Sequence, residues 1–143
     1  MPEYSIIESE LQNIKRELLI VRIVAERKTT RNLDEIDIRA AALSLAAMYN
    51  GMEKILIQLL ILKKIEINES SAWHSMLLQK AKDAGIISEI VFTDLKGFMG
   101  FRHFVRHAYS FDIAPETIEA VIDKAPKLVD CFYNEIVEYM ARP

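Results

Sequence analysis

The stretch from Ala40 to Leu62 constrains the fold more than any other part of this chain, because apolar residues occupy nearly every face of the helix it would form. A helix with one polar face can lie at a surface, whereas a helix that is apolar all round has to be covered on every side. We therefore expect a central helix, enclosed by other helices or, on one side, by a second subunit. Small residues within the stretch would allow close approach, namely Ala40, Ala41, Ala42, Ala46 and Ala47.

Breaks in the chain are few, which favours long helices around this central one. Gly and Pro number four each among 143 residues, and no segment alternates apolar and polar residues as a strand does. The apolar periodicity predicts about five helices, starting near residues 3, 33, 72, 88 and 115. Residues 1–143 would then form a single all-α domain, an up-and-down helical bundle.

Local signals mark several of the predicted helix boundaries. Ser71 and Ser88 stand where N-cap residues are expected, and Gly85 is placed to terminate the third helix. Pro115 suits the first position of the last helix. Pro126 lies inside the apolar stripe of that helix, where it should kink the helix or split it in two.

The bulk composition argues against several classes of protein. A net charge of -3 is unlike that of a protein that coats nucleic acid non-specifically. The single Cys131 excludes an internal disulfide and suits a reducing cytoplasm. The most apolar run, Ile55–Leu62, is shorter than the roughly 20 residues of a membrane span, and no signal segment is visible. We therefore expect a cytoplasmic protein without a membrane partner.

One short segment, Phe101–Tyr109, concentrates cationic and proton-transferring groups in this mildly acidic chain. No acidic residue occurs between Leu95 and Phe111. Guanidinium groups bind phosphate, and an imidazole can move a proton near neutral pH. This combination supports RNA cleavage without a metal, in which a histidine accepts the proton of the ribose 2′-OH and an arginine stabilises the reacting phosphate. The candidate residues are Arg102, His103, Arg106 and His107.

The spacing of Arg102 and His107 sets a geometric condition on such a site. Five residues correspond to about 140° around a helix axis, so a single straight helix points the two side chains in different directions. They can act together if the helix ends or distorts between them, or if two copies of the chain face each other across a two-fold axis. His103, or His107 of the second copy, would then protonate the leaving oxygen. DNA lacks the 2′-OH nucleophile, so selectivity for RNA would be chemical.

Each of these residues also has a plainer interpretation. His107 can be a capping or core histidine, and Arg102 can pair with an acid from another helix, such as Glu53. His103 and His107 have the i, i+4 spacing of a zinc pair, but a third ligand is missing unless His74 supplies it. We therefore expect neither a metal nor another cofactor. The remaining aromatic residues of this region are expected in the core, namely Phe98, Phe101 and Phe104.

Three segments in order, Tyr49–Leu56, Trp73–Leu78 and Phe101–Tyr109, resemble one known family. In the last segment Arg102 and His107 are followed by Tyr109, which gives the pattern Arg-x4-His-x-Tyr. This pattern is similar to the motif of the HEPN ribonucleases, specifically the HepT-like toxins of HEPN–MNT toxin–antitoxin pairs. The resemblance covers roughly residues 30–140.

The resemblance implies a fold, an activity and partners. The fold would be a HEPN-type bundle that is dimeric, with a composite active site formed by Arg102 and His107 of both chains. The activity would be that of a metal-independent endoribonuclease toxin of a type VII-like pair, acting on tRNA or mRNA in a prokaryotic cytoplasm. An MNT-type nucleotidyltransferase antitoxin would transfer AMP to Tyr109 and silence the toxin. His103, at a position that is often Asn in the family, and Arg106 would support the site or bind phosphate.

Two other functions remain open from the sequence. The chain can be a non-catalytic HEPN module that binds RNA, a nucleotide or a nucleotidyltransferase through the same pocket. In that case Arg102→Ala would abolish binding and no RNA would be cut. It can also be a helical dimerisation domain, in which case His107→Ala would alter neither RNA nor partner behaviour.

Overall fold

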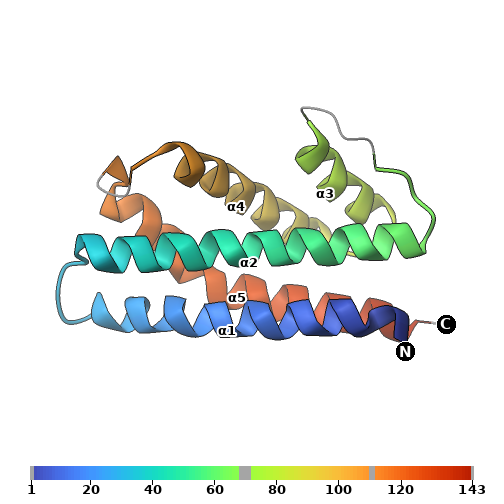
Figure 1. Ribbon diagram of the computed structural model, residues 1–143, viewed down its shortest axis with the longest axis horizontal. Helices are drawn as coiled ribbons and strands as arrows, with labels where there is room; N and C mark the ends of the chain where they lie inside the picture. Colours follow the sequence, from blue (N-terminus) through green and yellow to red (C-terminus); the bar gives the residue numbers. More distant parts are fainter. Residues whose placement is uncertain (1, 68–71, 110–111, 143) are drawn as a thin grey trace.

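The computed structural model describes residues 2–67, 72–109 and 112–142 and contains five α-helices in these ranges (Figure 1). The α-helices follow a 3-10 turn at Pro2–Tyr4 and are α1 (Ser5–Arg27), α2 (Glu35–Leu62), α3 (Trp73–Asp83), α4 (Glu89–His107) and α5 (Pro115–Ala141). No strand occurs among the described residues. The prediction of an all-α bundle of about five helices is confirmed.

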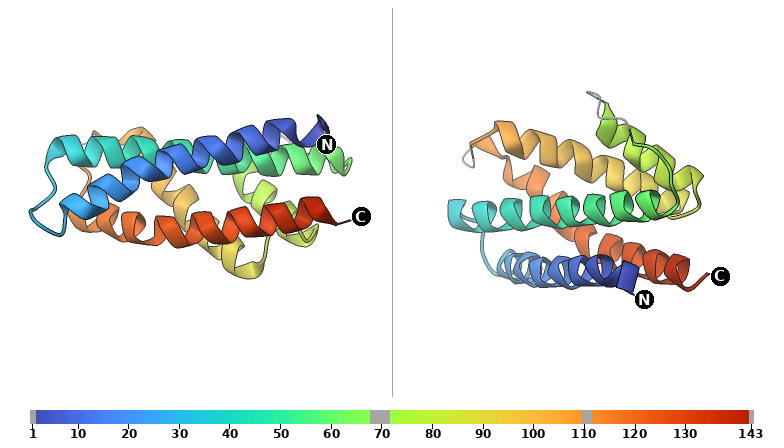
Figure 2. Two further views of the ribbon diagram at one scale, coloured as in Figure 1. Left: turned by 90° about the horizontal axis from the view of Figure 1, so that it is seen from below. Right: turned by 45° about the vertical axis from the view of Figure 1, so that its right-hand side comes forward.

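Helix α2 is the centre of the bundle and contacts each of the other four α-helices. Figure 1 shows α1 on one side of α2 and α3 and α4 on the opposite side, and Figure 2 shows α5 running lengthwise beside α1. The N- and C-termini lie at the same end of the molecule. Within one chain the other helices do not enclose α2 on every side, because its residues Ile36 and Leu43 are 74% and 73% exposed.

By length and composition alone, α2 is the one helix in the described ranges that passes as a candidate membrane span. The structure gives another reason for that composition, since 56% of the most apolar window of α2 is buried inside the bundle. A helix packed against four others needs apolar residues on most of its faces.

Several helix boundaries follow from local chemistry, as predicted. The Ser88 hydroxyl caps α4 by accepting a hydrogen bond from the Val91 N–H at 3.2 Å. Gly85 follows the end of α3 with φ +74°, a left-handed conformation that favours glycine. Pro115 is the first residue of α5, where its missing N–H costs no helical hydrogen bond.

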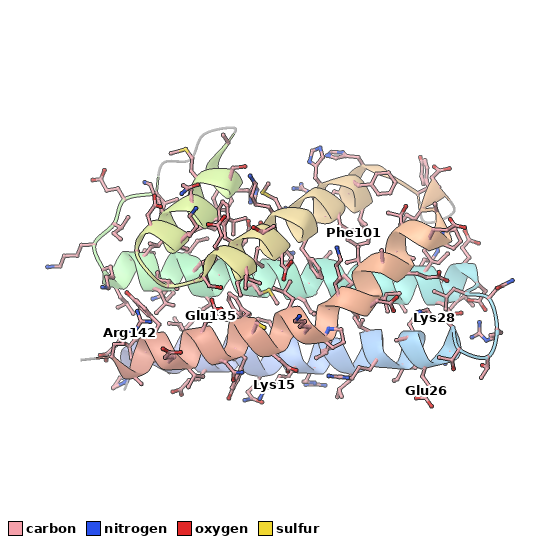
Figure 3. The ribbon with its side chains drawn as sticks, turned by 180° about the vertical axis from the view of Figure 1, so that it is seen from behind. Lys15, Glu26, Lys28, Phe101, Glu135 and Arg142 are labelled. Carbon is pink, nitrogen blue, oxygen red and sulfur yellow. The ribbon has the colours of Figure 1, made fainter. Side chains whose placement is uncertain are left out.

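Two further boundary predictions concern Pro126, where the structure decides between the two alternatives, and Ser71, which it does not test. Helix α5 continues through Pro126 and is not split in two, although Figure 3 shows that its axis changes direction along its length. Ser71 lies outside the described residues, and α3 begins after Ala72 without a side-chain cap.

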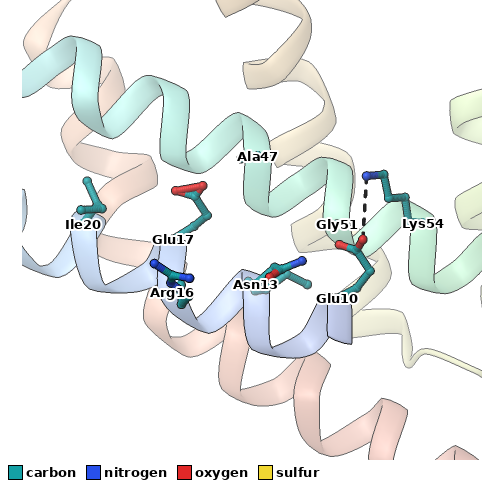
Figure 4. A pocket seen from close by; sticks show the side chains of 9 residues that line it. Glu10, Asn13, Arg16, Glu17, Ile20, Ala47, Gly51 and Lys54 are labelled. Carbon is teal, nitrogen blue, oxygen red and sulfur yellow. Dashed lines mark ion pairs between the residues drawn. The ribbon is translucent and has the colours of Figure 1, made fainter. Parts of the chain in front are cut away.

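Helices α1 and α2 form an antiparallel hairpin and approach each other closely at Gly51. A Cβ atom at this position would lie 3.0 Å from Cγ1 of Ile14 on α1, so the absence of a side chain lets the two helices meet. Figure 4 shows Gly51 in the wall of a cavity of about 500 Å³ between α1 and α2. An ion pair at 3.8 Å joins Lys54 and Glu10 across this cavity.

The turn between α1 and α2 is closed by the buried carboxylate of Asp37. Arg27 and Arg31 both pair with this carboxylate, at 3.0 Å and 2.5 Å. Asp34 and Asp37 form a reciprocal capping box at the start of α2. The hydrogen bond from Arg31 is the largest reason that the pKa of Asp37 lies well below its ordinary value, and it outweighs burial, which acts in the opposite direction.

Replacement of Asp37 by Asn should therefore lower thermal stability in a pH-dependent way. The pKa of the carboxyl is lower in the folded state than the value of about 3.9 expected for an unfolded chain. Its stabilising contribution is thus fully present above about pH 4 and is lost as the pH falls further. We expect the melting temperature of Asp37→Asn to lie a few degrees below that of the wild type at pH 7, and the difference to shrink at pH 3.

Thermal unfolding followed by circular dichroism checks this expectation. Asp123→Asn is the control, because Asp123 pairs with Lys28 at 3.1 Å but is exposed, and exposed pairs contribute little. A difference between Asp37→Asn and the wild type that is the same at pH 7 and pH 3 would contradict the role given to the charge.

Candidate active site at the end of helix α4

The five candidate residues lie on the last two turns of α4 and just beyond them. Helix α4 continues without a break through His107, and Ala108 is extended. Distortion of the helix between Arg102 and His107 is therefore excluded as a way to bring them together. Arg102 is half-buried, whereas the other candidates are exposed, namely His103, Arg106, His107 and Tyr109.

The apolar side of α4 decides where each candidate points. Phe98 and Phe101 are buried, and Phe101, labelled in Figure 3, lies on the side of α4 that faces the rest of the bundle. Arg102 follows on this side, and its Cζ atom lies 5.9 Å from the centre of the Tyr49 ring on α2. The structure thus directs the guanidinium group towards the bundle rather than into solvent.

The two histidines occupy another side of the helix. The rings of His103 and His107 contact each other edge to face, with centroids 4.8 Å apart. The structure therefore brings together His103 and His107, as their i, i+4 spacing predicts. It does not bring together Arg102 and His107 within one chain.

The cationic side chains of this cluster have no acidic partner in the described part of the chain. Arg102, His103, Arg106 and His107 make no hydrogen bond or ion pair with a described residue. Because a half-buried arginine normally finds an acceptor, the open donors of Arg102 are the most unusual electrostatic feature of this region. These donors are free to bind an anion.

Glu53, the acid considered above as a partner of Arg102, pairs with a different residue. Its Oε2 atom lies 2.6 Å from Nδ1 of His74 on α3, and Glu53 is only 5% exposed. The His74 ring also stacks on Trp73, with centroids 4.0 Å apart. His74 is thus engaged away from His103 and His107, and the described residues contain no group of three or more His, Cys, Asp or Glu suited to a metal.

Tyr49 is a residue of the site that the motif analysis did not identify. It is fully buried, and burial is the main reason that the pKa of its hydroxyl is raised, followed by the negative charge of Glu53. The positive charge of Arg102 acts in the opposite direction. The sequence feature that could have indicated Tyr49 is its spacing from Glu53, because four residues place the two side chains on the same face of α2.

The outer face of α4 is uncovered and partly apolar. Phe104, expected in the core, is 44% exposed, and Ile90 is 68% exposed. A Cβ atom at Gly97 or Gly100 would have no neighbour within 4 Å, so packing within one chain does not explain these glycines. Helical spacings of three, four and seven place Ile90, Gly97, Gly100, Phe104 and His107 on this one face.

The family model described as HepT-like protein matches residues 40–142. The chain belongs to the HepT-like family. The match covers most of α2 and all of α3, α4 and α5, so it includes every candidate residue of this HepT-like protein, and the helical bundle is of the HEPN type. No curated protein and no solved structure matches the HepT-like chain.

Proposed function

We propose that this HepT-like protein is a metal-independent endoribonuclease, the toxin of a type VII-like HEPN–MNT pair in a prokaryotic cytoplasm. The observation that carries the proposal is the cluster of guanidinium and imidazole groups at the end of α4, which have no acidic partner among the described residues. Its substrate would be an RNA, either tRNA or mRNA. The 2′-OH of the ribose supplies the nucleophile, so the reaction needs only a proton acceptor, a proton donor and charge stabilisation.

In the proposed reaction His107 accepts the proton of the 2′-OH. The 2′ oxygen forms a bond to the adjacent phosphorus, and the bond from phosphorus to the 5′ oxygen breaks. His103, or His107 of a second copy, donates a proton to that leaving oxygen. Arg102 stabilises the charge on the non-bridging oxygens, and Arg106 holds a neighbouring phosphate. The products are a 2′,3′-cyclic phosphate and a 5′-hydroxyl.

A second copy of the chain would complete the site. In one chain Arg102 faces α2, while His107 lies on the uncovered face of α4. A two-fold contact through that face would place His107 of one copy near Arg102 of the other. The exposed Ile90 and Phe104 and the glycines without neighbours support this face, because a close helix contact needs both apolar area and small residues.

The antitoxin would act through Tyr109. This tyrosine is 73% exposed and follows His107 by two residues, so it is accessible to a modifying enzyme. An MNT-type nucleotidyltransferase would transfer AMP to the Tyr109 hydroxyl. The added phosphate would compete with RNA for the arginines of the cluster and so silence the toxin.

Cleavage of total cellular RNA in EDTA is the direct test of the nuclease. We expect the unmodified wild type to cut, and His107→Ala to cut at least about a hundredfold more slowly, since general acid–base catalysis contributes on this scale. Arg39→Ala is the control, because Arg39 is an exposed arginine of α2 that lies outside the cluster. If dimeric wild-type protein free of any adduct leaves RNA intact, the chain is a non-catalytic HEPN binding module.

Phe104→Glu should separate the subunits and strongly reduce cleavage. A carboxylate on each copy would meet its symmetry mate in the proposed contact, and like charges in an interface repel. We expect a monomer by light scattering and unchanged helicity. Cleavage should fall about a hundredfold, because the composite site needs both copies. Ile36→Glu is the matched control on the uncovered face of α2. Loss of the dimer in Ile36→Glu but not in Phe104→Glu would place the contact elsewhere.

Tyr109→Phe should prevent modification by the nucleotidyltransferase encoded beside this protein. With ATP present, we expect the intact mass of the wild type to increase by one or more AMP units and its RNA cleavage to stop. Tyr109→Phe should keep its mass and remain active in the same mixture. Tyr133→Phe, at a half-buried tyrosine of α5, should still be modified. An adduct of undiminished yield on Tyr109→Phe would exclude this residue as the acceptor.

A further inference from the structure

Arg102 contacts the ring of Tyr49, and two further side chains, Glu53 and His74, pair with each other one helical turn along α2 from that tyrosine. Tyr49 and Glu53 come from consecutive turns of α2, and His74 comes from α3. Glu53 is one of three buried polar or charged residues among those described, and the other two have structural partners, because Asp37 closes the first turn and Ser44 binds Glu17 at 3.1 Å. A buried carboxylate is unfavourable unless it is paired, and His74 supplies the pair.

Tyr49 interacts with both the buried carboxylate of Glu53 and the guanidinium group of Arg102. Its ring faces the guanidinium group, 5.9 Å from centre to Cζ, which is within the range of a cation–π contact. Its buried hydroxyl makes no hydrogen bond of standard geometry with a described residue, although, in addition to burial, Glu53 raises the pKa of this hydroxyl through its charge and through hydrogen bonding. The opposite effects of Glu53 and Arg102 on this hydroxyl show that it lies in the field of both charges.

We infer that Tyr49, Glu53 and His74 are positioning residues that hold the Arg102 guanidinium in the orientation that binds phosphate. This inference rests on the proposed function. The Tyr49 ring provides the surface on which the guanidinium lies. The Glu53 carboxylate attracts the guanidinium group, and the hydrogen bond from His74 fixes the carboxylate in place.

The arrangement differs from a direct ion pair in one important way. A carboxylate in contact with Arg102 would occupy the N–H donors that a phosphate needs. Glu53 forms its 2.6 Å contact with His74 instead, so none of the Arg102 donors is occupied by a carboxylate of the described residues. An arginine held in advance in this way binds a phosphate bidentately without first losing its side-chain freedom.

The test is steady-state cleavage of a mixed-sequence, single-stranded oligoribonucleotide that carries a fluorophore and a quencher. We expect Glu53→Gln, which keeps the shape and removes the charge, to lower kcat about tenfold with KM changed less than about threefold, since misplaced catalytic groups cost rate. Tyr49→Leu should lower kcat similarly. Tyr49→Phe keeps the ring and should restore most of the rate.

Two matched controls exist in the chain. Glu135 also links two helices, through hydrogen bonds of 2.7 Å from Ser88, so Glu135→Gln repeats the same substitution away from the site. Tyr139 is a buried tyrosine whose hydroxyl has no hydrogen-bond partner among the described residues and whose ring lies 5.6 Å from Cζ of Arg142. Tyr139→Leu therefore reproduces the loss of a buried ring under an arginine. Both controls should keep wild-type kcat.

A second measurement follows Arg102 directly and does not depend on catalysis. The Nε–H signal of Arg102 in a ¹H–¹⁵N spectrum, assigned with Arg102→Lys, should shift in Glu53→Gln and Tyr49→Leu and stay fixed in both controls. If the wild type cuts RNA but these variants keep both kcat and the Arg102 signal, the positioning role is overturned. If the wild type does not cut RNA, the proposed nuclease fails, and the Arg102 signal alone decides the positioning role.

Discussion

The burial of helix α2 is the constraint on which the rest of the structure depends. Its apolar residues occupy most of its circumference, so α1, α3, α4 and α5 all pack against it. The same packing places Tyr49 and Glu53 of α2 against α3 and α4, where they meet His74 and Arg102. The packing that buries the apolar helix α2 therefore also brings the charged residues of the cluster together.

Features that depend on neighbouring backbone could be predicted from the sequence. The Ser88 cap, the left-handed Gly85 and the start of α5 at Pro115 each follow from the chemistry of a few adjacent residues. Pro126 shows the limit of such local rules. It removes one helical hydrogen bond, but apolar residues on both sides of it pack against the core, so the helix bends and continues.

Features that depend on contacts between distant segments could not be predicted. In contrast, the angular separation of Arg102 and His107 could be predicted, because it follows from helix geometry alone and the unbroken α4 retains it. The partner of Glu53 is His74, which belongs to another helix, and no spacing within α2 indicates it. Periodicity likewise could not tell that the face of α4 with Phe104 is exposed in the described structure, whereas the face with Phe98 is buried.

The arrangement of the chain ends has a practical consequence for the design of recombinant protein. The two termini lie together at one end of the bundle, whereas α4 runs towards the opposite end (Figure 1). An affinity tag or a fluorescent fusion at either terminus would therefore be attached at the end of the bundle from which the His107 end of α4 points away. Either terminus can carry such an addition, including one large enough for surface immobilisation, without covering the cationic cluster.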